Sequence, residues 1–112
     1  MTLEEFKGLW DKSQAPETDI EVTEKDLYAV LCGYAFVVQK DGNVVFKKVI
    51  DTSFSIRDAF RMFRIYCRSH NVRYIRVEGS KRRYNYLFKM FPFCSFVRDD
   101  SAPDRNIFFV KL

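Results

Sequence analysis

The pair Asp41-Gly42 constrains the fold more than any other feature of this sequence. It separates two runs rich in β-branched and aromatic residues within the stretch from Asp26 to Asp51. An Asp-Gly pair between two such runs is a strong signal for a β-hairpin, because glycine readily adopts the positive φ that tight turns require. We therefore expect two antiparallel strands here, one on each side of the turn.

A long amphipathic helix is predicted directly after this hairpin. Ser55 is a suitable N-cap, Asp58 follows three residues later, and the pattern extends to about Asn71. The apolar positions recur at helical spacing and are expected on one broad face: Ile56, Ala59, Phe60, Phe63, Tyr66 and Cys67. Four arginines are expected in a narrow stripe on the opposite side: Arg57, Arg61, Arg64 and Arg68.

The remaining elements are predicted from the same kinds of pattern. Thr2 and Glu5 have the spacing of a capping box and open a short N-terminal helix. A surface connection with a short strand at Ile20–Val22 follows, and further along the chain we expect a strand in "VRYIRVE", a helix at Lys81–Phe91, and strands at Cys94–Arg98 and Asn106–Leu112.

This order of elements predicts one α+β domain over residues 1–112, with an N-terminal helix and connection in residues 1–26 and a core in residues 27–112. The core is expected to be a mixed, mostly antiparallel sheet of five to six strands with two or three helices. A strand, a long helix and another strand in succession favour a right-handed crossover, which would place one parallel pair inside that sheet.

Composition and charge narrow the class of protein. The chain has 112 residues, a formal net charge of +4, three widely spaced cysteines and one histidine, His70. The acidic N-terminus does not resemble a signal peptide, and the longest nearly apolar run, Tyr28–Val38, is too short to cross a bilayer. We expect an intracellular, cytoplasmic protein with reduced, buried thiols, no membrane contact and no metal site.

Several stretches resemble the GNAT superfamily of acyl-coenzyme A N-acyltransferases. The pair Gly33-Tyr34 is similar to a Gly-aromatic pair in the first long strand of that family, and "VRYIRVEGS" followed by "YNYLFKMFPF" resembles its fifth strand and fourth helix. The likeness covers Leu27–Leu112 and implies a GNAT-like fold, shortened at its N-terminal side.

Two departures bear on the chemistry that this resemblance implies. The family holds the coenzyme A pyrophosphate on a glycine-rich loop before a helix, where backbone N–H groups can approach the phosphates. Here that junction reads "DTSFSIRDA", without glycine, with the charge of Asp51 and the bulk of Phe54. The residues left for a phosphate, if acetyl-CoA binds, are Ser53, Ser55 and Arg57. The family's general acid, a tyrosine, aligns with Phe88, which has no proton to donate.

The sequence therefore favours a non-catalytic binding or assembly module on a degenerate GNAT-like fold, with no catalytic residue and no cofactor assigned. Small GNAT-like proteins of this kind occur in bacteriophages, so the resemblance implies a role in a virion or against a host factor. The predicted contact with a protein partner or with another copy of the chain is the stripe of Arg57, Arg61, Arg64 and Arg68, since aligned guanidinium groups concentrate positive potential.

Two alternatives remain open. The first is an acyl-CoA-dependent N-acetyltransferase with a diverged cofactor loop. The second is a nucleic-acid-binding protein, which would use the arginine stripe or the cluster Lys81–Arg83 with Tyr84 and Tyr86. Because the aromatic residues of the latter segment recur at helical spacing, we favour a role in core packing for them.

Overall fold

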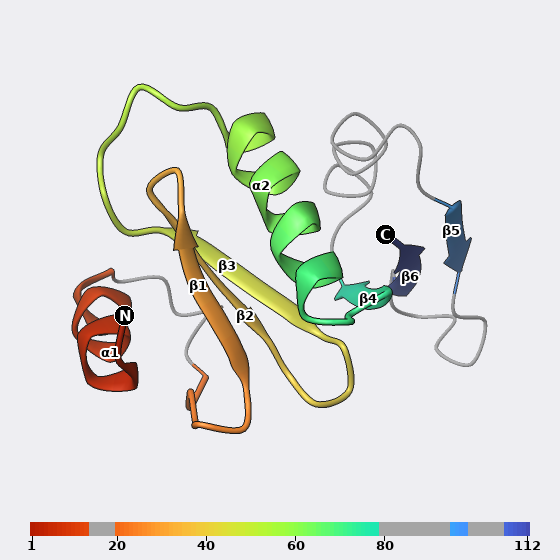
Figure 1. Cartoon of the computed structure of the whole chain (residues 1–112), viewed down its shortest axis with the longest axis horizontal. Helices are drawn as coiled ribbons and strands as arrows, with labels where there is room; N and C mark the ends of the chain where they lie inside the picture. The colour runs from red at the N-terminus through yellow and green to blue at the C-terminus, as the bar shows by residue number, and fades with distance from the viewer. Residues whose placement is uncertain (14–19, 79–94, 99–106) are drawn as a thin grey trace.

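The structure, a computed structural model, describes residues 1–13, 20–78, 95–98 and 107–112. These residues form two helices and six strands (Figure 1): α1 (Leu3–Lys12), β1 (Leu27–Leu31), β2 (Tyr34–Val38), β3 (Val44–Lys48), α2 (Ile56–Ser69), β4 (Tyr74–Glu78), β5 (Ser95–Arg98) and β6 (Ile107–Lys111). The protein is thus an α+β domain. The helix predicted at Lys81–Phe91 lies outside the described residues.

The strands form two antiparallel sheets, which we call sheet A and sheet B. Sheet A has the order β1-β2-β3 and sheet B the order β4-β6-β5. In the described part of the chain their backbones meet at one parallel bridge between Asn43 and Arg76, where the Arg76 N–H donates to the Gly42 carbonyl at 2.7 Å. The prediction of one mixed sheet of five to six strands is therefore wrong for the described strands, where the expected parallel pair is limited to this single bridge.

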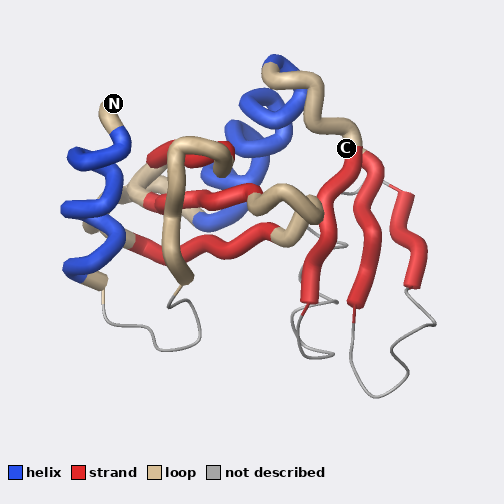
Figure 2. Tube along the Cα trace, turned by 90° about the horizontal axis from the view of Figure 1, so that it is seen from below, coloured by secondary structure: helices blue, strands red, loops and turns tan. Residues whose placement is uncertain are grey.

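Apolar side chains buried beneath α2 hold the two sheets together, although their backbones pair at a single bridge in the described residues. The core beneath this helix takes Phe36, Val38 and Val44 from sheet A and Ile75, Val77 and Val110 from sheet B. Figure 2 shows the two sheets side by side with their strands running in different directions. Since apolar burial is non-directional, it can hold sheets together that do not share a hydrogen-bonded edge.

The first predicted strand is in fact two strands. A two-residue turn at Cys32-Gly33 divides it, so that Leu31 pairs with Tyr34 across a tight hairpin. Both turn residues have positive φ, 50° and 83°, which is the conformation that a type I′ turn requires. Cysteine is an uncommon residue at such a position, which is why the pattern read as one strand. The resemblance implied that Gly33 lies within a strand. In the structure it lies in the turn between β1 and β2.

Other predicted elements are confirmed. The Asp41-Gly42 turn joins β2 to β3, with Gly42 at a φ of 85°. The Thr2 hydroxyl caps α1 by accepting from the Glu5 N–H at 3.2 Å. The strand at Ile20–Val22 is wrong, because these residues pair with no described strand, and the side chains of Ile20 and Val22 pack in the cluster that contains Phe6 and Trp10.

Sheet A lies between the two helices. Along β2 the side chains alternate, with Ala35 and Val37 in the cluster that contains Phe6 and Trp10 of α1, and Phe36 in the cluster beneath α2. Figure 1 accordingly shows α1 and α2 on opposite sides of this sheet. The two helices therefore present their solvent-facing sides in different directions. Neither of them has the length and apolar character needed to cross a membrane.

We predict opposite effects for alanine at two glycines. A Cβ at Gly33 would lie 2.5 Å from the Ile50 carbonyl oxygen on a backbone with positive φ, so Gly33→Ala should destabilise the fold by about 1–3 kcal/mol. A Cβ at Gly8, within α1, would meet nothing within 4 Å, so Gly8→Ala should stabilise it by about 0.5–1 kcal/mol. Urea unfolding of both variants measures this, and equal effects would contradict the turn geometry.

Candidate functional site

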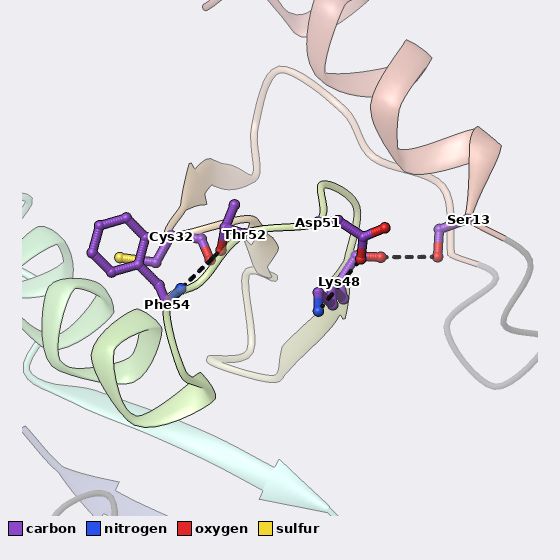
Figure 3. Close-up of polar contacts among 6 residues, drawn as sticks. All are labelled: Ser13, Cys32, Lys48, Asp51, Thr52 and Phe54. Carbon is purple, nitrogen blue, oxygen red and sulfur yellow. Dashed lines mark hydrogen bonds and ion pairs between the residues drawn. The ribbon is translucent and has the colours of Figure 1, made fainter.

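The segment between β3 and α2 is held by the neighbouring β1–β2 turn. The N–H groups of Val49 and Ile50 both donate to the Gly33 carbonyl, at 2.9 and 3.1 Å. The Thr52 hydroxyl donates to the Cys32 carbonyl at 3.2 Å and accepts from the Phe54 N–H at 3.3 Å (Figure 3). This segment contains no glycine, yet it follows a defined path because a glycine on the adjacent turn leaves room for it.

The N-terminus of α2 is closed by its own side chains. The Ser55 hydroxyl accepts from the Asp58 N–H at 3.2 Å, and the Asp58 carboxylate accepts from the Ser55 N–H at 3.0 Å and from the Ser55 hydroxyl at 2.9 Å. These bonds form the predicted capping box. Hydrogen bonds from Ser55, together with the nearby charges of Arg61 and Arg57, hold the pKa of Asp58 below its usual 3.8.

An external phosphate would have to compete with this internal anion. The three residues predicted to bind a phosphate are all exposed at this helix terminus: Ser53, Ser55 and Arg57. Ser55, however, already uses its hydroxyl and its N–H in the capping box. A carboxylate placed here also offsets the positive end of the helix dipole, which is what attracts anions to a helix N-terminus. Phe54, expected to crowd the site, instead has its side chain largely in solvent.

The predicted apolar face of α2 is confirmed: Ala59, Phe60, Phe63 and Cys67 are buried, and Ile56 and Tyr66 are half-buried. The arginine stripe is displaced from its predicted position. At about 100° per residue, the arginines lie roughly 90° to 145° from the centre of the buried face, on one flank of the helix. Arg57, Arg61 and Arg68 are exposed there, while Arg64 is half-buried.

Positive charge on this flank has little local compensation. One ion pair closer than 4 Å is found among the described residues. It joins Lys48 Nζ and Asp51 Oδ1 at 3.5 Å and does not involve α2. Asp58 is the one acidic residue in the sequence of the helix, against four arginines. The Nε atom of Arg64 is buried and has no hydrogen-bond partner within the described structure. An anionic group brought to this flank would therefore meet unpaired guanidinium groups.

Two of the residues that face away from the core are apolar, which the sequence pattern did not lead us to expect. Met62 and Ile65 are 44% and 57% exposed, and Ile65 lies almost diametrically opposite the buried face. Their helical spacing from the arginines can be read in the sequence, but their exposure depends on which face of α2 packs on the sheets. Arginines beside exposed aliphatic side chains are typical of the composition of protein interfaces.

A shallow groove of about 290 Å³ lies where the C-terminal end of α1 meets the segment after β3. It is lined by Lys12, Ser13, Lys48, Val49, Ile50 and Asp51. The Ser13 hydroxyl donates to the Lys48 carbonyl across it at 3.3 Å (Figure 3). Because Lys48 pairs with Asp51 and the groove is open, it offers no concentrated charge to a ligand.

The other candidate residues have structural surroundings. Burial raises the pKa of the Cys67 thiol to about 12, so this thiol stays protonated and unreactive. The Nδ1 atom of His70 lies 2.9 Å from the Tyr66 carbonyl oxygen, and His70 forms the C-cap of α2. Cys94, Phe88, Tyr84, Tyr86 and the cluster Lys81–Arg83 lie outside the described residues.

Comparisons with protein-family models, with curated proteins and with solved structures find no match for this chain. Its function therefore has to be inferred from its own geometry.

We predict that the capping box sets part of the acid sensitivity of the protein. Because the folded-state pKa of Asp58 is lowered, its contribution to stability is present above about pH 3.8 and is lost as the pH falls through the lower, folded-state value. Asp58→Asn should remove this contribution and flatten the corresponding part of the stability curve, measured by urea unfolding between about pH 2 and 6.

Ser55→Ala provides the matched test of the cap itself. Losing an N-cap hydroxyl typically lowers stability by about 1 kcal/mol. The loss should be largest near neutral pH, where Asp58 is ionised. Equal losses at neutral and strongly acidic pH would contradict the coupling between the two side chains.

Proposed function

We propose that the chain is a non-catalytic binding or assembly module on a degenerate GNAT-like fold, acting through the exposed side of α2 on a protein partner. The observation that carries this proposal is the capped N-terminus of α2, where the Asp58 carboxylate accepts from the N–H and the hydroxyl of Ser55 and places a negative charge where a phosphate would bind. An acyltransferase built on such a fold would need that position for its cofactor.

The composition of the exposed side of α2 supports a protein as the partner. Met62 and Ile65 supply apolar area, and Arg61 and Arg68 supply charge beside it. A surface for nucleic acid would more commonly combine its cations with polar or aromatic residues that stack on bases. A partner with acidic and apolar side chains on one face would satisfy both features of this helix.

The GNAT-like fold is itself part of the proposal. The order of a hairpin, a long helix, a strand and a final antiparallel pair carries the resemblance, and the parallel bridge between Asn43 and Arg76 agrees with the crossover that this order implies. Proteins of bacteriophages include small members of this kind, so a role in a virion or against a host factor belongs to the same proposal.

A second candidate is an acyl-CoA N-acyltransferase with a diverged loop. The observation in its favour is that β3 begins at its contact with β4 and then leads away from it, so the two strands diverge (Figure 1). In this case Ser53 and Arg57 would have to hold the pyrophosphate in competition with Asp58.

We predict that acetyl-CoA does not raise the melting temperature. A ligand with a Kd of about 0.1 mM, added at about 1 mM, would stabilise the folded state by about 1.4 kcal/mol. For a chain of this length that corresponds to a shift of about 6 °C, which is easily measured. A shift of this size that Arg57→Ala abolishes would contradict the proposal and establish the acyltransferase.

A salt titration with DNA and RNA tests the nucleic-acid alternative. Binding through the arginine stripe would weaken steeply with salt and would be lost in the variant Arg61→Glu/Arg68→Glu. The variant Lys25→Glu/Lys40→Glu is the matched control, because it makes the same change in net charge at exposed positions away from α2. Salt-sensitive retardation that only the first variant removes would establish nucleic acid as the partner.

A further inference from the structure

Charge is divided unevenly along the chain. Residues 1–26 contain eight acidic and three basic residues, a net charge of −5, whereas residues 27–112 contain seven acidic and sixteen basic residues, a net charge of +9. The modest net charge of +4 for the whole chain conceals this division. A molecule with an acidic part and a basic part can attract another copy of itself.

The structure places one helix from each part on opposite faces of sheet A. The acidic part begins with α1, which packs on one face of the sheet through Phe6 and Trp10. The basic part includes α2, which packs on the other face through Phe60 and Phe63 (Figures 1 and 2). A surface on α1 and a surface on α2 therefore cannot neutralise each other within one molecule.

The exposed side of α1 carries Glu4 and Asp11, seven residues apart and hence about 10.5 Å apart along the axis. Gly8 lies between them and is exposed, and no described residue outside the helix comes within 4 Å of the position that a Cβ would occupy. The fold itself thus gives no reason for a glycine within this helix, where it is less favourable than alanine. Lys7 and Lys12 lie to either side of the Glu4-Gly8-Asp11 row.

The exposed side of α2 carries a row with the same spacing. Arg61, Ile65 and Arg68 are related as i, i+4 and i+7, as are Glu4, Gly8 and Asp11. When one row faces the other, each arginine can meet a carboxylate, and the side chain of Ile65 can approach the helix at the glycine. The two rows are complementary in charge, in spacing and in shape.

We propose that the partner of α2 is α1 of a second copy of this chain, so that the module assembles by head-to-tail contacts. This inference rests on the proposed function and specifies its partner. Because the two rows lie on opposite sides of sheet A, each contact leaves one α1 and one α2 free at the ends. Such a heterologous contact produces open chains, or rings if the rotation closes. Exposed ion pairs contribute little each, so the association is weak and is seen at high protein concentration.

Sedimentation velocity over a range of protein concentrations tests this inference. At about 0.01 M salt, where the Debye length is about 30 Å, the weight-average sedimentation coefficient should rise with concentration. At about 1 M salt, where the Debye length is about 3 Å, the rise should disappear. A chain that remains monomeric at low salt would overturn the inference.

Charge reversal identifies the two rows. Arg61→Glu/Arg68→Glu and Glu4→Lys/Asp11→Lys should each weaken association at low salt at least tenfold. Their matched controls, Lys25→Glu/Lys40→Glu and Glu21→Lys/Glu24→Lys, change net charge equally at exposed positions of other segments and should retain it. The variant that combines both reversals keeps the original net charge of +4 and should regain association. Association that survives either reversal, or that fails to return in the combined variant, would contradict the pairing of α1 with α2.

Gly8→Leu tests the shape of the contact without changing its charge. Leucine is a good helix former and the position is open, so the melting temperature should not fall. Association at low salt should nevertheless weaken at least tenfold, because the side chain keeps the two helices apart. Unchanged association would overturn the close approach of Ile65 to Gly8.

None of these results depends on acetyl-CoA, so a monomeric chain would refute the self-pairing alone, whereas a thermal shift with acetyl-CoA would refute the proposed function.

Discussion

Contacts among four phenylalanines determine how α2 lies on the rest of the molecule. The rings of Phe36 and Phe63 stack with centroids 4.5 Å apart, and Phe60 meets both Phe36 and Phe46 edge-on, at 5.3 and 4.8 Å. Edge-on and offset arrangements are preferred by aromatic pairs and restrict rotation of the helix about its axis. The Tyr66 hydroxyl adds a hydrogen bond to the Tyr28 carbonyl at 2.9 Å. With this orientation set, Ile65 faces away from the core and the arginines lie on one flank of the helix.

The β1–β2 turn has a second influence, on the segment that leads into α2. Gly33 accepts two hydrogen bonds from this segment and leaves the space in which Ile50 and Thr52 pass close by. The glycine-free segment before α2 thus depends on a glycine from a different turn. The capping box then closes the helix terminus with Asp58. An internal carboxylate thus lies at the end of the helix dipole where an external anion would bind.

The amphipathic and capping patterns were sufficient to predict α1, α2 and the Asp41-Gly42 hairpin, because these features arise from interactions within a few residues. Ser55 and Asp58 are three positions apart, and their mutual hydrogen bonds need no other part of the chain. The predictions that failed depend on distant residues. The Cys32-Gly33 turn is stabilised by pairing of β1 with β2 and by its contacts with Ile50 and Thr52, none of which a local pattern contains.

The candidate site divides in the same way. The sequence by itself determined that four arginines share one side of α2, since helical periodicity depends only on residue spacing. It also determined that acidic residues gather before residue 27 and basic ones after it. Only the tertiary structure decided that Ile65 is exposed beside the arginines and that α1 and α2 lie on opposite faces of one sheet. The reason is physical: exposure and relative position follow from which apolar side chains pack together, and that packing joins segments far apart in the chain.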